Sequence, residues 1–143
     1  MRILVINGPN LNMLGIREPG IYGKETYGGL CAYIEEQAEK LGVEAEVFQS
    51  NSEGAIVTRI QKALGDYDAI VINPAAYTHY SYAILDALKA VALPAVEVHL
   101  SDISTREAFR QVSVTKAACI AQISGKGFAG YEEAMKRLVN LEK

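Results

Sequence analysis

The sequence predicts a doubly wound α/β fold, in which helices cover both faces of a five-stranded parallel sheet. Short apolar runs alternate along the chain with segments whose apolar residues recur every three or four positions. Strands that are joined through helices in this way pair in parallel. The 143 residues are enough for one domain, and no linker, repeat or low-complexity segment divides them. We therefore expect a single α/β domain over residues 1–143.

The block 69–101 shows this alternation most clearly. One apolar run ends at Asn73-Pro74, and a second one closes the block. The helix predicted between them carries its apolar residues on one face, namely Ile84, Leu85, Leu88 and Val91. The only two histidines of the chain, His79 and His99, lie at or just after the ends of these two runs. Open parallel sheets bind ligands at the carboxyl ends of their strands, so we expect the active site there.

The other elements follow from the same patterns. An apolar strand opens the chain, and an irregular loop then runs to Thr26, which can cap a helix that Gly42 ends. Further along we expect a strand at 43–49, a helix that starts at 50–53, a short helix at 101–112, a fifth strand at 117–123 and a helix at 131–141. Five strands connected in this way are expected in the flavodoxin-like order 2-1-3-4-5.

Composition narrows the class of protein. Charged residues make up 22% of the chain and the net charge is -3, without a basic run, which argues against a nucleic-acid partner. No apolar stretch is long enough to span a bilayer, and the first strand leaves no room for a signal peptide, so a membrane partner is not expected. Cys31 and Cys119 lie in apolar surroundings and are interpreted as buried free thiols. We expect a cytoplasmic protein.

One glycine pattern imitates a nucleotide site. Gly125, Gly127 and Gly130 spell G-x-G-x-x-G between a predicted strand and a predicted helix. A dinucleotide site of this type also needs a following strand with an acidic residue about twenty positions on, and the chain ends before that point. We interpret these glycines as a tight turn.

The long loop after the first strand carries side chains suited to proton transfer, and we expect a lid over the active site around 17–25. Tyr22 is the candidate base, because the guanidinium of Arg17 can stabilise its phenolate. His99 is the candidate acid, and Glu97 faces the same side of the strand, where it can orient His99 or keep it protonated. The alternatives are that Tyr22 is a surface residue and that His99 is a satisfied core histidine.

Other polar residues at this edge have two interpretations each. Asn73 can form a turn, and His79 can either donate to a substrate hydroxyl or cap the following helix. The backbone amides of Leu100 and Ser101 offer a cradle for a carboxylate. Asp86 lies away from the apolar helix face and points to solvent or to a neighbouring subunit. The guanidiniums of Arg106 and Arg110 can face an anionic ligand. Alternatively, they can pair with Glu107 or Asp102. No metal-ligand spacing and no nucleophile elbow occurs.

At this point the sequence resembles the type II 3-dehydroquinate dehydratases. The resemblance runs through the whole chain in the motifs ILVINGPNLNMLGIREPGIYG, FQSNSEG, INPAAYTHYS, EVHLSDISTREAFR and GFAGY. It implies a flavodoxin-like subunit in a homo-oligomer, a dodecamer of trimers. It also implies a lyase that dehydrates 3-dehydroquinate, a small anionic substrate, to 3-dehydroshikimate in the shikimate pathway, without metal or cofactor.

The resemblance also implies roles for single residues. Tyr22 matches the base that takes the C2 proton, and Arg17 matches the residue that activates it. His99 matches the acid that protonates the leaving C1 hydroxyl, and Asn10 matches a residue that helps hold the water beside the enolate. The other matches are Asn73 with the amides of Leu100 and Ser101 for the carboxylate, His79 and Arg110 for hydroxyls, Asp86 for a neighbouring subunit's site, and Glu97 and Arg106 for supporting positions.

Three positions depart from the family pattern. Ser52 stands where many members have His, Leu85 where Arg is frequent, and Ser104-Thr105 where His-Ala or Tyr-Ala is common. None of them is a predicted catalytic residue. A rival hypothesis is a non-catalytic flavodoxin-like binding or signalling module. The acidic residues of a phosphoacceptor and the Ser/Thr-rich phosphate loop of a flavodoxin are both missing after the first strand.

Overall fold

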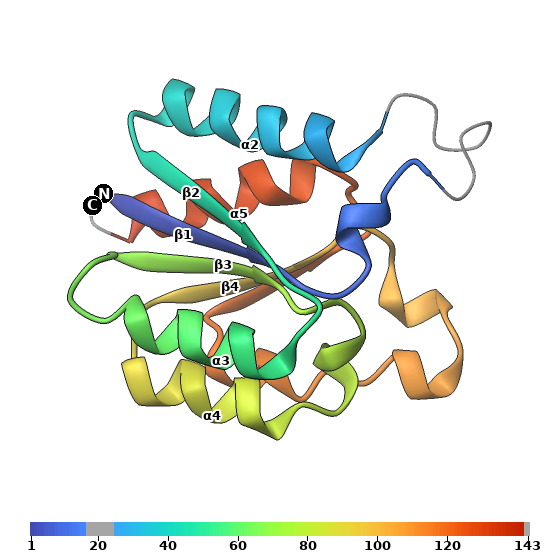
Figure 1. The fold of residues 1–143 in the computed structure, drawn as a ribbon. Coiled ribbons are helices and arrows are strands. Elements are labelled where there is room, and N and C mark those ends of the chain that lie inside the picture. The colour runs from blue at the N-terminus through green and yellow to red at the C-terminus, as the bar shows by residue number, and fades with distance from the viewer. Residues whose placement is uncertain (17–24, 142–143) are drawn as a thin grey trace.

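The protein is described by a computed structural model over residues 1–16 and 25–141, and its centre is one parallel sheet. The strands lie in the order β2-β1-β3-β4-β5, as the sequence predicts (Figure 1). Their bounds are Arg2–Asn7 for β1, Glu44–Gln49 for β2, Ala69–Asn73 for β3, Ala95–His99 for β4 and Ala121–Ser124 for β5. All four pairings are parallel, so the carboxyl ends of the strands share one edge.

Two pairs of helices cover the two faces of the sheet, with α2 and α5 on one face and α3 and α4 on the other (Figure 1). The bounds are Tyr27–Leu41 for α2, Glu53–Lys62 for α3, Tyr82–Val91 for α4 and Ala129–Asn140 for α5. Three of these helices start at a hydroxyl cap, because Thr26, Ser52 and Ser81 each accept a backbone N–H of the first turn. Each such cap contributes about 1 kcal/mol to helix stability. No helix in the described ranges is long and apolar enough to cross a membrane.

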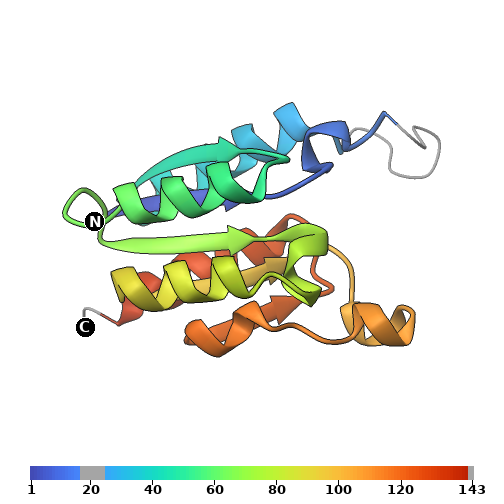
Figure 2. The same ribbon diagram turned by 60° about the horizontal axis from the view of Figure 1, so that its bottom comes forward.

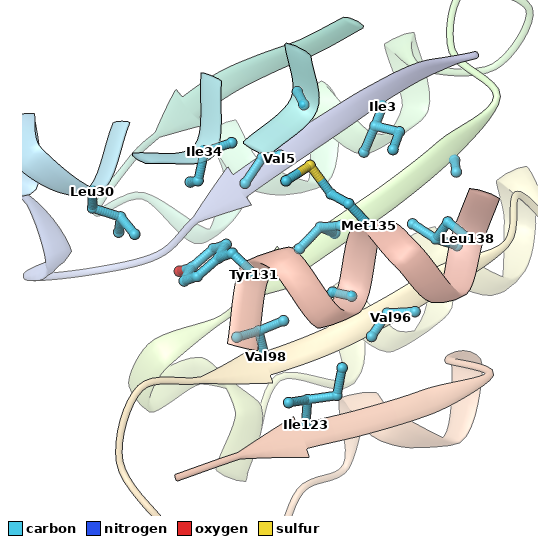
Figure 3. Packing of buried hydrophobic residues seen from close by; sticks show 14 residues of the cluster. Ile3, Val5, Leu30, Ile34, Val96, Val98, Ile123, Tyr131, Met135 and Leu138 are labelled. Atoms are coloured by element: carbon cyan, nitrogen blue, oxygen red, sulfur yellow. The ribbon is translucent and has the colours of Figure 1, made fainter. Parts of the chain in front are cut away.

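The core consists of two apolar clusters, one on each side of the sheet. The central strands β1, β3 and β4 are buried on both faces, which explains why they appear in the sequence as continuous apolar runs. On the α5 side, Tyr131, Met135 and Leu138 pack against the sheet beside Val96 and Val98 (Figure 3). The other cluster lies between the sheet and α3 and α4, and it includes Ile84, Leu88 and Val91 of the apolar face predicted for α4.

The sequence prediction was wrong between residues 101 and 121. The short helix expected at 101–112 is two separate 3₁₀ turns, Ile103–Thr105 and Ala108–Arg110. The strand expected from residue 117 begins only at Ala121, and a 3₁₀ turn, Thr115–Ala118, precedes it beside α4 (Figure 2). The reason is that Ser113 and Thr115 both donate hydrogen bonds to the buried carboxylate of Glu97. An extended strand through these residues would not permit both bonds.

The glycine pattern forms the tight turn that we expected. Gly125 and Gly127 have φ values of 80° and 56°, a region in which glycine carries no steric penalty. Their amides donate to the carbonyls of His99 and Leu100. This turn therefore ties the end of β5 to the residues that follow β4. Helix α5 also begins two residues earlier than expected, at Ala129.

Candidate active site

A pocket of about 280 Å³ lies at the carboxyl ends of β1, β3 and β4, where the sequence predicts the active site. It contains most of the predicted site residues, namely Asn10, Asn73, His79, His99, Leu100, Ser101, Arg106 and Arg110. Sequence reasoning missed the other lining residues, which are Pro9, Leu11, Ala75, Ala76 and Ile103. These five are small or apolar and carry no chemical signal of their own. Strand ends from three separate parts of the chain thus build one site.

Four predicted residues are not among the described pocket lining. Arg17 and Tyr22, with the predicted lid apart from Glu25, fall outside the described residues. Asp86 is exposed on α4 and is not part of the pocket lining, which agrees with the predicted outward direction of its side chain. Glu97 does not line the pocket either, but it touches a residue that does.

His99 is held at the pocket by a buried carboxylate. Its Nε2 lies 2.8 Å from Oε2 of Glu97, two residues earlier on β4. The two side chains are 6% and 0% exposed. Glu97 and His99 therefore lie on the same side of the strand and in contact, as the sequence predicts. His99 also lines the pocket, unlike an ordinary core histidine.

Glu97 is surrounded by donors. Ser113 and Gln122 each donate to its Oε2 at 2.7 Å, and Thr115 donates to Oε1. Burial raises the pKa of Glu97, but the hydrogen bonds from His99 and from these three residues outweigh burial and lower the pKa to about 2. The carboxylate is therefore ionised at neutral pH. Sequence reasoning missed this shell, because scattered Ser, Thr and Gln residues show no periodic pattern.

His79 is anchored by the backbone. Its Nδ1 lies 2.7 Å from the carbonyl oxygen of Val112, in the connection between the second 3₁₀ turn and β5. The helix that follows is capped by Ser81 instead, so the helix-capping interpretation of His79 is wrong. His79 itself lines the pocket.

Asn73 belongs to a buried polar chain behind the pocket. Its Oδ1 accepts the Ala75 amide at 3.1 Å, which confirms the predicted turn. Its Nδ2 donates to the hydroxyl of Tyr131 at 3.0 Å, and that hydroxyl donates to Oδ1 of Asn7 at 2.6 Å. Asn7 and Asn73 are register partners at the ends of β1 and β3. Two asparagines that each end an apolar strand were a signal that sequence reasoning did not use.

Asn10 is fixed through its backbone. Its φ of 71° is left-handed, a conformation that asparagine tolerates better than most residues. The Oδ1 of Asn51 accepts the Asn10 amide at 3.0 Å. The same Oδ1 accepts Nε2 of Gln49, which also donates to the Gly8 carbonyl at 3.1 Å. The loop after β2 thus supports the loop after β1.

The two arginines are placed differently from one another. Arg106 donates to the hydroxyl of Ser101 at 3.1 Å, within the predicted carboxylate cradle. The Nε of Arg110 lies 2.6 Å from a carboxylate oxygen of Glu107, an ion pair whose geometry is not that of a hydrogen bond. The pairing that the sequence left open therefore exists for Arg110. No carboxylate occurs among the described lining residues, so the pocket favours an anionic ligand.

Comparison with known proteins decides the family. Residues 1–139 match the family described as dehydroquinase class II. The chain belongs to this family. A 3-dehydroquinate dehydratase of Clostridium acetobutylicum is 56% identical over 141 residues, which cover 99% of this chain and 98% of that protein. The predicted family resemblance is confirmed.

Solved structures agree with this assignment. The crystal structure of a type II dehydroquinase from Butyrivibrio crossotus is 54% identical and has a TM-score of 0.92, over 96% of this chain and 97% of that one. The type II dehydroquinase from Propionibacterium acnes is 42% identical with a TM-score of 0.89, over 97% of this chain and 98% of that one.

The departures from the dehydroquinase pattern have local structural roles here. Ser52 caps α3 through a hydrogen bond from the Ala55 amide. Leu85 is buried on the apolar side of α4, and Ser104 donates to Asp102 at the start of a 3₁₀ turn. None of the three lines the pocket. The three departures therefore do not change the lining of the pocket.

Proposed function

We propose that the protein is a 3-dehydroquinate dehydratase, a lyase that converts 3-dehydroquinate to 3-dehydroshikimate in the shikimate pathway by acid–base elimination of water. The observation that carries the proposal is the polar pocket, in which a carboxylate-held histidine stands beside two arginines without a carboxylate in the described lining. Membership of the dehydroquinase class II family supplies the substrate. The pocket has room for a small anion.

His99 is the acid in this proposal. The ionised Glu97 lies 2.8 Å from Nε2 of His99 and orients the imidazole. A protonated His99 can give its pocket-side proton to the C1 hydroxyl, which then leaves as water. The burial of the pair strengthens this interaction relative to bulk water.

Tyr22 is the base, and the described tyrosines support this by exclusion. Burial raises the pKa of Tyr27 to about 12 and also raises the pKa of Tyr131, so both phenols stay neutral at pH 7. None of the seven described tyrosines lines the pocket. Tyr22 follows Arg17 in the loop that we propose as a lid, and a guanidinium there would favour the phenolate.

The reaction then has two steps. The phenolate of Tyr22 removes the C2 proton, which the adjacent carbonyl makes acidic, and an enolate forms. A water held with the help of Asn10 stabilises the enolate oxygen. The enolate electrons next form the C1–C2 double bond as the C1 hydroxyl takes a proton from His99 and departs. The proton on Tyr22 returns to solvent, and solvent reprotonates His99.

The other residues bind substrate. Asn73 with the amides of Leu100 and Ser101 holds the carboxylate, and Arg106 steadies the cradle through its bond to Ser101. His79 and Arg110 bind hydroxyls, and Arg110 then exchanges Glu107 for substrate. The proposal needs no metal or cofactor. Asp86 serves the site of a neighbouring subunit in a dodecamer of trimers.

The experiment is ultraviolet absorbance after 3-dehydroquinate is added to the protein with a chelator present, since the product is a conjugated enone carboxylate. We expect a steady rise that Tyr22→Phe abolishes and the matched surface variant Tyr33→Phe retains. No rise from folded, correctly assembled protein would contradict the proposal and favour a binding module. A rise with Tyr22→Phe at the wild-type rate would refute the base.

A further inference from the structure

The segment 112–115 contacts His79 directly and contacts Glu97, the hydrogen-bond partner of His99. The carbonyl of Val112 meets Nδ1 of His79 at 2.7 Å. Ser113 and Thr115, the next residues along, donate to the carboxylate of Glu97, which holds His99. One short segment, which runs into the last 3₁₀ turn, thus contacts the ring of His79 and, through Glu97, supports the ring of His99.

The proton position on His79 follows from the chemistry of its partner. A backbone carbonyl can only accept a hydrogen bond, so Nδ1 of His79 must carry the hydrogen in the bond to Val112. The other nitrogen of the neutral ring, Nε2, is then without hydrogen and can only accept.

The proton position on His99 follows in the same way but is the opposite. Glu97 already accepts from Ser113, Thr115 and Gln122, so it has no hydrogen to offer. The Nε2 of His99 must therefore donate to it, and Nδ1 remains for the pocket. The other titratable group that faces Glu97 is Cys119, and burial together with the Glu97 charge raises the pKa of its thiol to about 12.

Thr78 marks the outer limit of this network. Its hydroxyl lies 2.8 Å from that of Ser113 and 2.7 Å from that of Thr115, but it does not contact Glu97. Thr78 and Thr115 are both fully buried. They differ in one respect that matters here, namely direct donation to the carboxylate.

We propose that the segment 112–115 positions both histidines by fixing opposite tautomers of the neutral rings, with hydrogen on Nδ1 of His79 and on Nε2 of His99, so that the additional proton of the acid form of His99 is on Nδ1. Ser113 and Thr115 are positioning residues, which act on His99 through Glu97. The inference deepens the proposed function, in which His99 is the acid and His79 binds a hydroxyl. It gives a reason for that choice, since a neutral His79 with a bare Nε2 accepts from a hydroxyl and repels a carboxylate or carbonyl oxygen.

Nitrogen-15 NMR of histidine-labelled full-length protein tests the tautomers without substrate. The chain has only two histidines, so four ring nitrogens are observed, and His79→Asn assigns them. The spectra are recorded at a pH at which both rings are neutral. In each ring the nitrogen without hydrogen resonates far downfield, and we expect it to be Nε2 in His79 and Nδ1 in His99. The same tautomer in both rings, or the reverse assignment, would overturn the proposal.

Carbon-13 NMR of the glutamate carboxyls tests the positioning residues, with Glu97→Gln to assign the Glu97 signal. Each donor removed from a carboxylate raises its pKa by about one to two pH units. The double variant Ser113→Ala/Thr115→Val should therefore raise the Glu97 midpoint by about two to four pH units. The exchange variant Ser113→Thr/Thr115→Ser keeps both hydroxyls and should restore the wild-type midpoint.

Thr78→Val is the matched control, because it makes the same buried substitution one layer further out. We expect its Glu97 midpoint to equal that of the wild type, and equal midpoints in Thr78→Val and the double variant would overturn the positioning role. If the double variant does not fold, Thr115→Val alone carries the test, with an expected rise of about one to two pH units. Neither NMR measurement depends on turnover. Wild-type protein that is inactive but has these tautomers would therefore refute the proposed dehydratase function and leave the positioning role of residues 112–115 standing.

Discussion

Removal of the buried hydroxyl of Tyr131 should lower the free energy of unfolding more than the loss of a single atom suggests. Tyr131 lies on the first turn of α5, is fully buried, and faces the sheet (Figure 3). Its hydroxyl donates to Asn7 at 2.6 Å and accepts from Asn73 at 3.0 Å. In Tyr131→Phe the ring still fills its site, but both asparagines lose their partner in a region that water does not reach.

The magnitude follows from the two groups that are left without a partner. A buried polar group without its hydrogen bond costs about 1–3 kcal/mol, so for two groups the free energy of unfolding should fall by about 2–6 kcal/mol. Tyr33→Phe is the control, since its hydroxyl donates to Glu132 at 3.1 Å in a partly buried position. We expect that control to lose no more than about 1 kcal/mol.

Urea denaturation of both variants at one protein concentration measures this difference. The concentration must be fixed, because the stability of an oligomer depends on it. A shift of the Tyr131→Phe midpoint no larger than that of Tyr33→Phe would refute the idea that the Asn7–Tyr131–Asn73 chain supports the pocket. We also expect a raised KM in Tyr131→Phe, because Asn73 is no longer held toward the carboxylate site.

Two further predictions concern pH and the loop after β1. The folded-state pKa of Glu97 is about 2, whereas its ordinary value is 4.5. The contribution of Glu97 to the free energy of unfolding is therefore fully present above pH 4.5 and is lost as the pH falls toward 2. That loss amounts to about 3 kcal/mol of unfolding free energy. Acid titration followed by circular dichroism should show it, and an equally steep curve for Glu97→Gln would contradict it. Asn51→Ala removes the side-chain oxygen that accepts the Asn10 amide. That hydrogen bond contributes about 1 kcal/mol to holding Asn10 in place, so its loss should lower kcat/KM about fivefold. An unchanged kcat/KM would show that Asn10 needs no support from that loop.

The sequence predicted the architecture because the governing patterns are local and periodic. Apolar runs of the buried strands, the hydroxyl caps of α2 and α3, and the glycine at the end of α2 all lie where propensity and pattern placed them. The pocket followed from topology, since parallel strands bring Asn73 and His99 to one edge. The predicted contact between Glu97 and His99 is also present, because the two residues are two apart on one strand.

The features that sequence reasoning missed depend on contacts between distant segments. The hydroxyls of Ser113 and Thr115 reach Glu97 across 16 and 18 positions, and Tyr131 reaches Asn7 across 124. No periodicity marks such pairs. The same contacts explain the misplaced start of β5, since the need to satisfy a buried carboxylate overrode the apolar run at residue 117.

The most direct test of the proposed stepwise elimination is deuterium exchange at C2 of 3-dehydroquinate in D₂O, followed by proton NMR with the variant His99→Asn. Removal of the acid blocks departure of the C1 hydroxyl but leaves Tyr22 free to form the enolate. We therefore expect C2 exchange to continue while product formation falls by about 10²–10⁴-fold, and both to stop in Tyr22→Phe. Loss of exchange together with product formation in folded His99→Asn would contradict the separate roles of base and acid.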